Sequence, residues 1–148
     1  MSTSPNRYPP GYTEAMTRPA SNSSDQQPVW LYDGDCGPCE QASTRIADLV
    51  DPPVRMAAYQ TEDLPALGVS MADVERGPVL VLADRTHLVG PPAMGRLLAM
   101  SERPFALVGA VMLAPGVRSV LGAIGPRMYA QRGRLPGAGD ACATRAAA

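Results

Sequence analysis

The chain has 148 residues, enough for one domain with a hydrophobic core, and its formal net charge is −1. A near-neutral chain lacks the basic footprint of proteins that bind nucleic acids, so we expect no nucleic-acid partner. All 13 basic residues are arginine, which excludes a catalytic or Schiff-base lysine.

The N-terminal residues and the few cysteines set the expected compartment. Residues 1–27 lack a positively charged start followed by an apolar core, so we expect no signal peptide there. They are rich in Ser, Pro and Asn, have little to bury, and are predicted to form a disordered N-terminal tail. Three cysteines are too few for a disulfide-stapled secreted fold, and no stretch reaches the roughly 18–20 apolar residues of a spanning helix. We therefore expect a cytoplasmic protein without a transmembrane segment.

The first predicted elements are a strand and a helix joined by an acidic turn. The folded region is expected to begin near Pro28, with a short buried strand over residues 29–32. Residues 33–35, Asp-Gly-Asp, predict a turn, and a helix should follow over about residues 37–50. Pro38 suits its first turn, where a missing N–H costs nothing. The predicted inward face consists of apolar residues at helical spacing, namely Cys39, Ala42, Ile46, Leu49 and Val50.

A second strand completes a βαβ unit. Residues 54–59 alternate with a period of two, which predicts a strand. Strand, helix and strand within about thirty residues predict two parallel strands joined by a right-handed crossover. Residues 61–63 and 70–73 then carry helix-capping patterns, so we expect short helical turns after the second strand.

The middle of the chain predicts a hairpin and another helix. Residues 78–82 form an apolar β run, residues 83–86 a turn, and residues 87–89 a second strand that returns beside the first. Pro91 or Pro92 then starts a helix, because proline is favoured in a first helical turn.

These elements follow the order β-α-β-(α)-β-β-α, which is the layout of a thioredoxin-like α/β domain. We assign this core to residues 28–101. Residues 102–148 should form a helical extension packed on the core and a mobile C-terminus, with apolar helices over about residues 105–113 and 117–130. A contact of residues 105–113 with a membrane surface stays open as a less favoured alternative.

Cys36 and Cys39 form a Cys-x-x-Cys pair at the predicted start of the first helix, a redox signature where strands and helices alternate. The N-terminus of a helix has unpaired N–H groups and a partial positive charge, and both stabilise a thiolate. Cys36 lies at or just before the first turn, so it is the expected nucleophile. Cys39, one turn later and on the buried face, should be less exposed and should resolve the mixed disulfide.

Asp35 precedes this pair and leaves two roles open. Its carboxylate opposes thiolate formation on Cys36 by like-charge repulsion, or it accepts a proton if it is held close. Asp35 is therefore a candidate catalytic residue together with Cys36 and Cys39.

Residues 32–39 read Tyr-Asp-Gly-Asp-Cys-Gly-Pro-Cys and resemble the signature of the DCC family of thiol-disulfide oxidoreductases, named for its Asp-Cys-x-x-Cys. Residues 36–39 also equal the active-site tetrapeptide of thioredoxin, with Asp35 where thioredoxin has tryptophan. The resemblance implies an enzyme that exchanges a Cys36–Cys39 disulfide with a protein or a small thiol substrate. It implies no bound cofactor and leaves the electron donor unknown.

Weaker matches to the same family follow at Tyr59-Gln60, at residues 129–132 and at residues 140–142. The family usually has Asn-Arg where this chain has Gln131-Arg132. In total the similarity covers roughly residues 29–142.

Gly77-Pro78 stands just before the hairpin strand, where thioredoxins have a cis-proline that lines the substrate groove facing the disulfide. By this correspondence Pro78 is a candidate substrate-binding residue, with a cis peptide bond before it. The alternative is a trans proline that starts the strand.

A zinc site is the main alternative to redox chemistry. Zinc usually takes four ligands, and Cys36, Cys39, Cys142 and His87 would supply three cysteines and one histidine. No second paired knuckle exists, so we favour redox chemistry without a resident metal. In the alternative, a non-enzymatic domain binds zinc or a partner, or senses redox state. Outside a zinc site, Cys142 is either a regulatory or resolving thiol or a thiol on a mobile tail, and His87 is a surface or core histidine.

Overall fold

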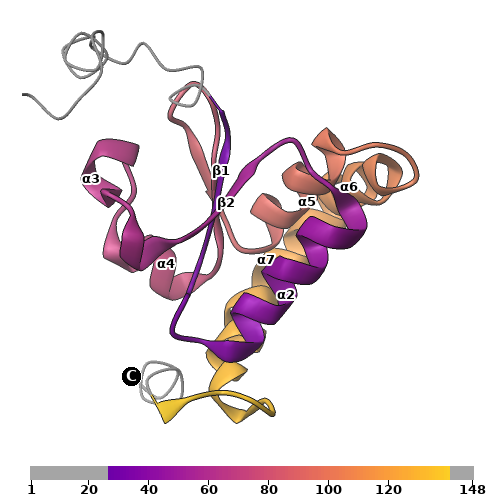
Figure 1. Cartoon of the computed structure of the whole chain (residues 1–148). Coiled ribbons are helices and arrows are strands. Elements are labelled where there is room, and N and C mark those ends of the chain that lie inside the picture. Colours follow the sequence, from indigo (N-terminus) through magenta and orange to yellow (C-terminus); the bar gives the residue numbers. More distant parts are fainter. Residues whose placement is uncertain (1–26, 141–148) are drawn as a thin grey trace, which may run out of the picture.

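A four-stranded mixed β-sheet runs through residues 27–140, the part of the chain that the structure, a computed structural model, describes (Figure 1). Its order is β2-β1-β3-β4, with β1 (Val29–Tyr32), β2 (Arg55–Ala58), β3 (Val79–Val81) and β4 (His87–Val89). β1 and β2 are parallel, whereas β3 is antiparallel to both β1 and β4. The predicted α/β class, the parallel strand pair and the hairpin are thus confirmed.

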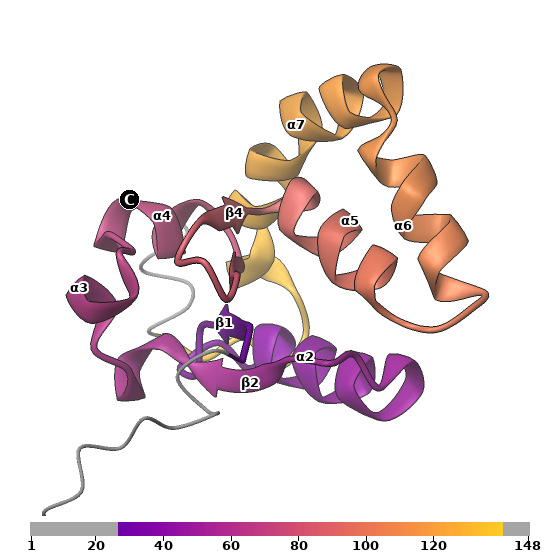
Figure 2. The ribbon, with the colours of Figure 1, turned by 90° about the horizontal axis from the view of Figure 1, so that it is seen from above.

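Six α-helices accompany the sheet among the described residues. They are α2 (Gly37–Val50), α3 (Leu64–Leu67), α4 (Met71–Arg76), α5 (Pro91–Met100), α6 (Phe105–Leu113) and α7 (Pro115–Ala130). α3 and α4 cover one face of the sheet, and α2 and α5 cover the other (Figure 1). α6 lies on the far side of α5 from the sheet (Figure 2). The predicted disordered tail and mobile C-terminus fall on residues 1–26 and 141–148, which lie outside the described residues.

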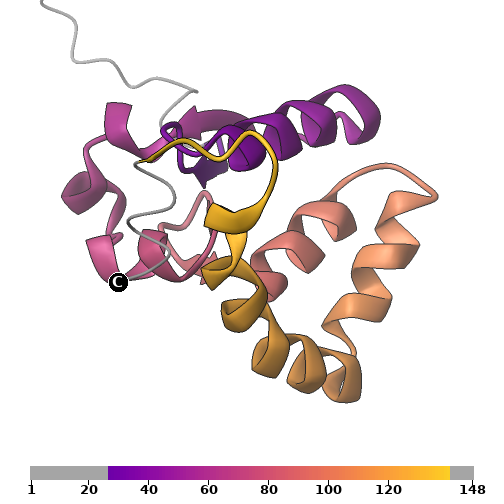
Figure 3. The same cartoon turned by 90° about the horizontal axis from the view of Figure 1, so that it is seen from below.

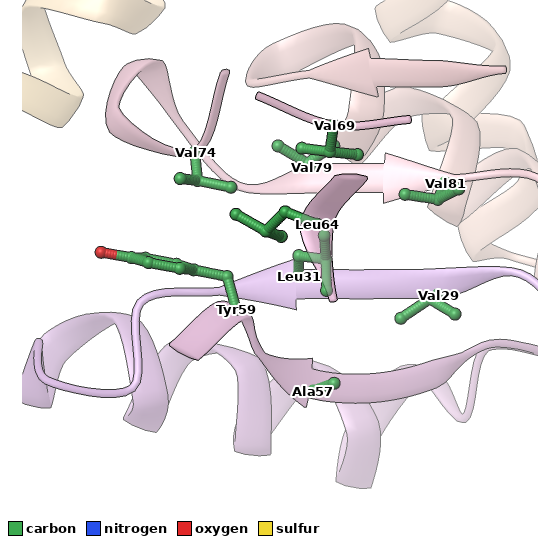
Figure 4. Packing of buried hydrophobic residues seen from close by; sticks show 9 residues of the cluster. All are labelled: Val29, Leu31, Ala57, Tyr59, Leu64, Val69, Val74, Val79 and Val81. Atoms are coloured by element: carbon green, nitrogen blue, oxygen red, sulfur yellow. The ribbon is translucent and has the colours of Figure 1, made fainter. Parts of the chain in front are cut away.

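The first core fills the face of the sheet under α3 and α4. Alternate residues of the strands point into it, because successive side chains of a strand point to opposite faces. Figure 4 shows its nine buried residues, which are Val29, Leu31, Ala57, Tyr59, Leu64, Val69, Val74, Val79 and Val81. Side-chain caps start both helices: Asp63 accepts from the Ala66 N–H, and Ser70 and Asp73 form a reciprocal capping box.

The second core lies on the opposite face, under α2 and α5. Trp30 and Leu97 are almost completely buried in it. Trp30 Nε1 donates a 3.2 Å hydrogen bond to Ser43 Oγ in α2, which satisfies a donor that would otherwise be buried without a partner. With Ser43 turned toward the sheet, Leu49 is left 73% exposed. The predicted inward face of this helix is therefore wrong at Leu49 and at Ala42, which is also exposed, although Ile46 does pack against the core.

α6 packs on α5 through a glycine. A Cβ atom at Gly109 would overlap the backbone of Gly95 and Ala99, so a larger residue would force the helices apart. The chain then bends by 84° into α7, all of whose residues are described and none of which is fully buried. Within residues 27–140 no single helix is long and apolar enough to cross a membrane, and α6 and α7 reach that length and hydropathy only together. Apolar side chains of both helices stay exposed, among them Leu107, Val111, Val120 and Met128.

Candidate active site

The Cys-x-x-Cys pair lies at the start of α2, where the sequence predicts it. Cys36 is the N-cap residue, and its carbonyl accepts a 3.0 Å hydrogen bond from the Glu40 N–H. A hydrogen bond from the Cys36 N–H to the Asp33 carbonyl closes the turn before the helix. Cys39 is the third residue of α2, and its Sγ lies 2.6 Å from the Cys36 Sγ. Both sulfur atoms therefore share the positive end of the helix, which stabilises a thiolate.

The exposure of the two cysteines is the reverse of the prediction. Cys36 is 0% exposed, whereas Cys39 is only half-buried and lines a cavity. The segment after α7 runs past the start of α2 (Figure 3), and a Cβ atom at Gly37 would overlap the carbonyl oxygen of Gly137. We attribute the burial of Cys36 to this close packing. Cys39, in contrast, is accessible from the cavity.

Asp33, directly after β1, is the buried acid of the site. Its side chain is 1% exposed, and its Oδ1 accepts hydrogen bonds from the Asp35 N–H at 3.1 Å and from Gln60 Nε2 at 2.7 Å. Gln60 belongs to the 3-10 helix η2 (Tyr59–Thr61), and its Oε1 accepts a 3.0 Å hydrogen bond from the Gly34 N–H. Gln60 thus ties the turn that carries the cysteines to the end of β2.

Arg132 approaches Asp33 from the other end of the described chain. It begins the 3-10 helix η3 (Arg132–Arg134), and its Nη2 lies 3.9 Å from Asp33 Oδ2. Its Nη1 donates a 3.1 Å hydrogen bond to the Tyr129 carbonyl, and its guanidinium carbon lies 4.0 Å from the centroid of the Tyr129 ring. The side chain is 6% exposed, and its Nε is buried without a hydrogen-bond partner among the described residues. A buried cation therefore lies beside Asp33, and among the described residues its Nε has no acceptor.

Tyr129, near the end of α7, lies close enough to both cysteines to feel their charge. Burial raises the pKa of its phenol well above the ordinary value, and negative charge on Cys39 raises that pKa further. Arg132 opposes this increase in the pKa, while Asp33 and Cys36 add to it. The phenol therefore keeps its proton at physiological pH.

Asp35, the acid that the sequence favours as a catalytic candidate, is exposed on the turn. The structure instead gathers Asp33, Gln60, Tyr129 and Arg132 around the pair, and none of these four was predicted as a site residue. A signal for all four was present, because the signature at residues 32–39 contains Asp33 and the weaker motifs of the family resemblance contain Gln60, Tyr129 and Arg132.

A cavity of about 430 Å³ opens beside Cys39, on the face of the sheet that α2 and α5 cover. Its walls come from the sheet and from α2, α5, α6 and α7, and they are mostly apolar. Pro78, the candidate substrate-binding residue, lines it together with Cys39 and Tyr129. Among the described residues, the charged side chains on the wall are Asp33, Arg76 and Arg132. Cys39 and Pro78, far apart in the sequence, are thus brought to one cavity.

The peptide bond before Pro78 is trans, so of the two forms that the sequence left open the cis bond is excluded. Within residues 27–140 the cis peptide bond is the one between Arg103 and Pro104. The Pro78 carbonyl accepts a 2.8 Å hydrogen bond from the Gly90 N–H, which extends the pairing of β3 and β4 beyond Val79. Pro78 therefore starts its strand as a trans proline, the alternative that the sequence left open.

His87, one residue of the alternative zinc site, lies away from the cysteines. It pairs with Val81 across the hairpin, on the face of the sheet that α3 and α4 cover, and its Nε2 lies 3.5 Å from Asp73 Oδ2. The described part of the chain contains no group of three or more His, Cys, Asp or Glu side chains that could hold a metal ion. Cys142 lies outside that part.

Comparisons with known proteins give no significant match, whether with family models, with curated proteins or with solved structures. The chemistry of the site therefore rests on its own residues.

Proposed function

We propose that this protein is a thiol-disulfide oxidoreductase that cycles the Cys36–Cys39 pair between dithiol and disulfide. The observation that carries the proposal is the 2.6 Å separation of the two sulfur atoms at the N-terminus of α2, with one of them open to a cavity. The resemblance of residues 32–39 to the DCC signature supports the same activity. A sheet of order β2-β1-β3-β4, in which β3 alone runs opposite to the other three strands, supports a thioredoxin-like core.

Three features of the site favour the thiolate, which is the reactive species. The positive end of α2 stabilises negative charge on Cys36 and Cys39. The neutral phenol of Tyr129 adds no negative charge beside the cysteines. Arg132 neutralises Asp33, whose carboxylate would otherwise repel a thiolate nearby.

The difference in exposure favours Cys39 as the attacking thiol and Cys36 as the resolving thiol, which reverses the roles expected from the sequence. The Cys39 thiolate attacks one sulfur of a substrate disulfide, forms a mixed disulfide and releases the other sulfur as a thiolate. The Cys36 thiolate then attacks the Cys39 sulfur, releases the second substrate thiolate and closes the Cys36–Cys39 disulfide. Two electrons pass to the substrate, and the two protons of the protein thiols end on the substrate thiols. In the cytoplasm, the location that the sequence predicts, a dithiol donor restores the reduced pair.

Equilibration of the full chain in a graded series of dithiol redox buffers tests this activity. Cys142→Ser serves as the background, so that trapped thiols report only Cys36 and Cys39. Mass-spectrometric mapping of alkylated thiols is expected to show both residues changing together in a single two-electron transition, whose midpoint gives the reduction potential. Thiols that stay reduced across the whole series would overturn the proposal, and zinc bound to the same sample would favour the metal-binding alternative.

Single substitutions in the same background decide which sulfur attacks. Cys36→Ser leaves only Cys39 to react, and Cys39→Ser leaves only Cys36. With dithiodipyridine, an aromatic disulfide that releases a coloured thiol, we expect the Cys36→Ser protein to react severalfold faster, because its remaining sulfur faces the cavity. Faster reaction of the Cys39→Ser protein would return the attacking role to Cys36.

A further inference from the structure

The cavity beside Cys39 has the size and lining of a small-molecule site. Its volume of about 430 Å³ lies within the roughly 300–1,000 Å³ that is typical of such sites. Most of its wall is aliphatic or aromatic, with contributions from Trp30, Ile46, Met94, Met112, Leu121 and Leu135. An apolar molecule that enters removes its own surface and that of the wall from water, which favours binding.

Arg132 lines this apolar cavity with a guanidinium that the described residues satisfy only in part. Its Nη1 donates to the Tyr129 carbonyl, whereas its Nη2 lies 3.9 Å from Asp33 Oδ2, beyond hydrogen-bond distance. A carboxylate that reaches Nη2 from the cavity would gain a charge-assisted hydrogen bond. Arg76, whose side chain is 67% exposed and lies 3.9 Å from Asp73, adds a second cation to the wall. Each of these arginines lies beside an aspartate, so a ligand carboxylate is expected to be held by hydrogen bonds from Arg132 and not by an excess of positive charge.

We propose that the cavity binds a low-molecular-weight apolar disulfide or thiol that carries a carboxylate, with the carboxylate at Arg132 and the sulfur at Cys39. This inference rests on the proposed exchange reaction and names its substrate class. Cys39 and Arg132 line the same cavity, so one molecule can contact both. The exchange reduces the bound disulfide to two thiols while the Cys36–Cys39 dithiol is oxidised, and the carboxylate serves only to orient the molecule.

Binding of phenylpentanoate, an apolar carboxylate without sulfur, tests the site separately from the redox reaction. Trp30 is the only tryptophan of the chain and lines the cavity, so its fluorescence reports occupancy. We expect phenylpentanoate to bind the unmodified protein about tenfold more tightly than phenylpentanol, because only the carboxylate accepts a charge-assisted hydrogen bond from Arg132. Because this comparison uses the unmodified protein, it does not depend on whether a variant folds. Equal affinities for the two ligands, or no binding of phenylpentanoate, would overturn the inference.

Two arginine variants locate the carboxylate. Arg132→Leu is expected to weaken phenylpentanoate binding about tenfold and to leave phenylpentanol binding unchanged. Arg134→Leu changes an exposed residue of the same 3-10 helix that is not on the cavity wall, so it is the matched control and should leave both affinities unchanged. An equal loss in both variants, or a loss in neither, contradicts the role of Arg132.

Protection of Cys39 shows whether the ligand lies beside the sulfur. In a protein with Cys36→Ser and Cys142→Ser, saturating phenylpentanoate is expected to slow the reaction of Cys39 with dithiodipyridine. Binding without protection places the ligand elsewhere and overturns the inference.

The proposed exchange activity and the proposed substrate class can fail independently of each other. Redox cycling without binding removes only the substrate class, whereas selective binding with thiols that never cycle removes only the exchange activity.

Discussion

Asp33 joins three segments that lie far apart in the chain. It follows β1, it is held by Gln60 after β2, and it faces Arg132 after α7. Neither charge of the pair is open to water, since the two side chains are 1% and 6% exposed. An intact buried pair adds little net stability, but loss of one partner leaves the other charge buried and uncompensated.

Replacement of Asp33 should therefore lower the free energy of unfolding strongly, whereas replacement of Asp35 in the same turn should hardly change it. We expect Asp33→Ala to lower the free energy of unfolding by about 3 kcal/mol, because it leaves the Arg132 guanidinium buried without a counter-charge. Asp35→Ala removes an exposed carboxylate of the same turn and should change that free energy by less than about 0.5 kcal/mol. Urea denaturation followed by circular dichroism measures both, and equal effects of the two substitutions would refute this account of Asp33.

Among the larger elements, the contact between α5 and α6 helps to position α7, which also contacts α5 directly. Gly109 lets the two helices approach until the backbone atoms of Gly95 and Ala99 fill the space where a Cβ atom would lie. The same chain continues into α7, whose last turn and following residues supply Tyr129 and Arg132. The position of Tyr129 and Arg132 therefore depends in part on helix packing far from the cysteines.

A pair of glycine substitutions checks this contact. Gly109→Ala should lower the free energy of unfolding by about 1–2 kcal/mol, because separation of the helices outweighs the better helix propensity of alanine. Gly122→Ala, in the middle of α7 with open space around it, should raise that free energy by about 0.5–1 kcal/mol. Thermal and urea unfolding report both changes, and stabilisation by Gly109→Ala would show that α6 does not approach α5 so closely.

The helices and strands could be predicted because their start signals lie in neighbouring residues. The buried face of a helix could not always be predicted, because it depends on residues elsewhere in the chain. Pro38 near the start of α2 and Ser70 before α4 set those starts as the sequence predicts. The inward face of α2 depends on Trp30, which takes Ser43 as its hydrogen-bond partner and leaves Leu49 outside. The spacing of apolar residues within α2 gives no sign that Ser43 points inward and Leu49 outward.

On the scale of the whole molecule, the sheet and α2 supply the first residues of the site, and the chain after α5 supplies the rest of the cavity wall. The segment after α7 passes beside Cys36, and α6 and α7 complete the cavity on which Cys39 opens. The exposure of the cysteines was predicted wrongly for this reason, since the residues that pack over them lie about a hundred positions later and carry no local signal. The candidate pair itself, at the start of α2, could be predicted.

Displacement of that segment should uncover Cys36. In a protein with Cys39→Ser and Cys142→Ser, a further Gly37→Ala places a methyl group against the Gly137 carbonyl, so we expect Cys36 to be alkylated by iodoacetamide severalfold faster. Gly116→Ala, at an exposed glycine with open space, is the control and should leave the rate unchanged. An unchanged rate in the Gly37→Ala protein would mean that other residues keep Cys36 buried.

The ion pair between Asp33 and Arg132 joins two parts of the chain that are synthesised at different times. At roughly 5–20 residues per second, Arg132 leaves the ribosome roughly 5–20 s after Cys36. During this interval the strand and helix that carry the thiols are present, but the later helices that cover them are not. We expect every nascent chain to meet the small thiols and oxidants of its surroundings before its own cover exists. We therefore expect the compartment in which the protein is synthesised to set the initial redox state of the Cys36–Cys39 pair.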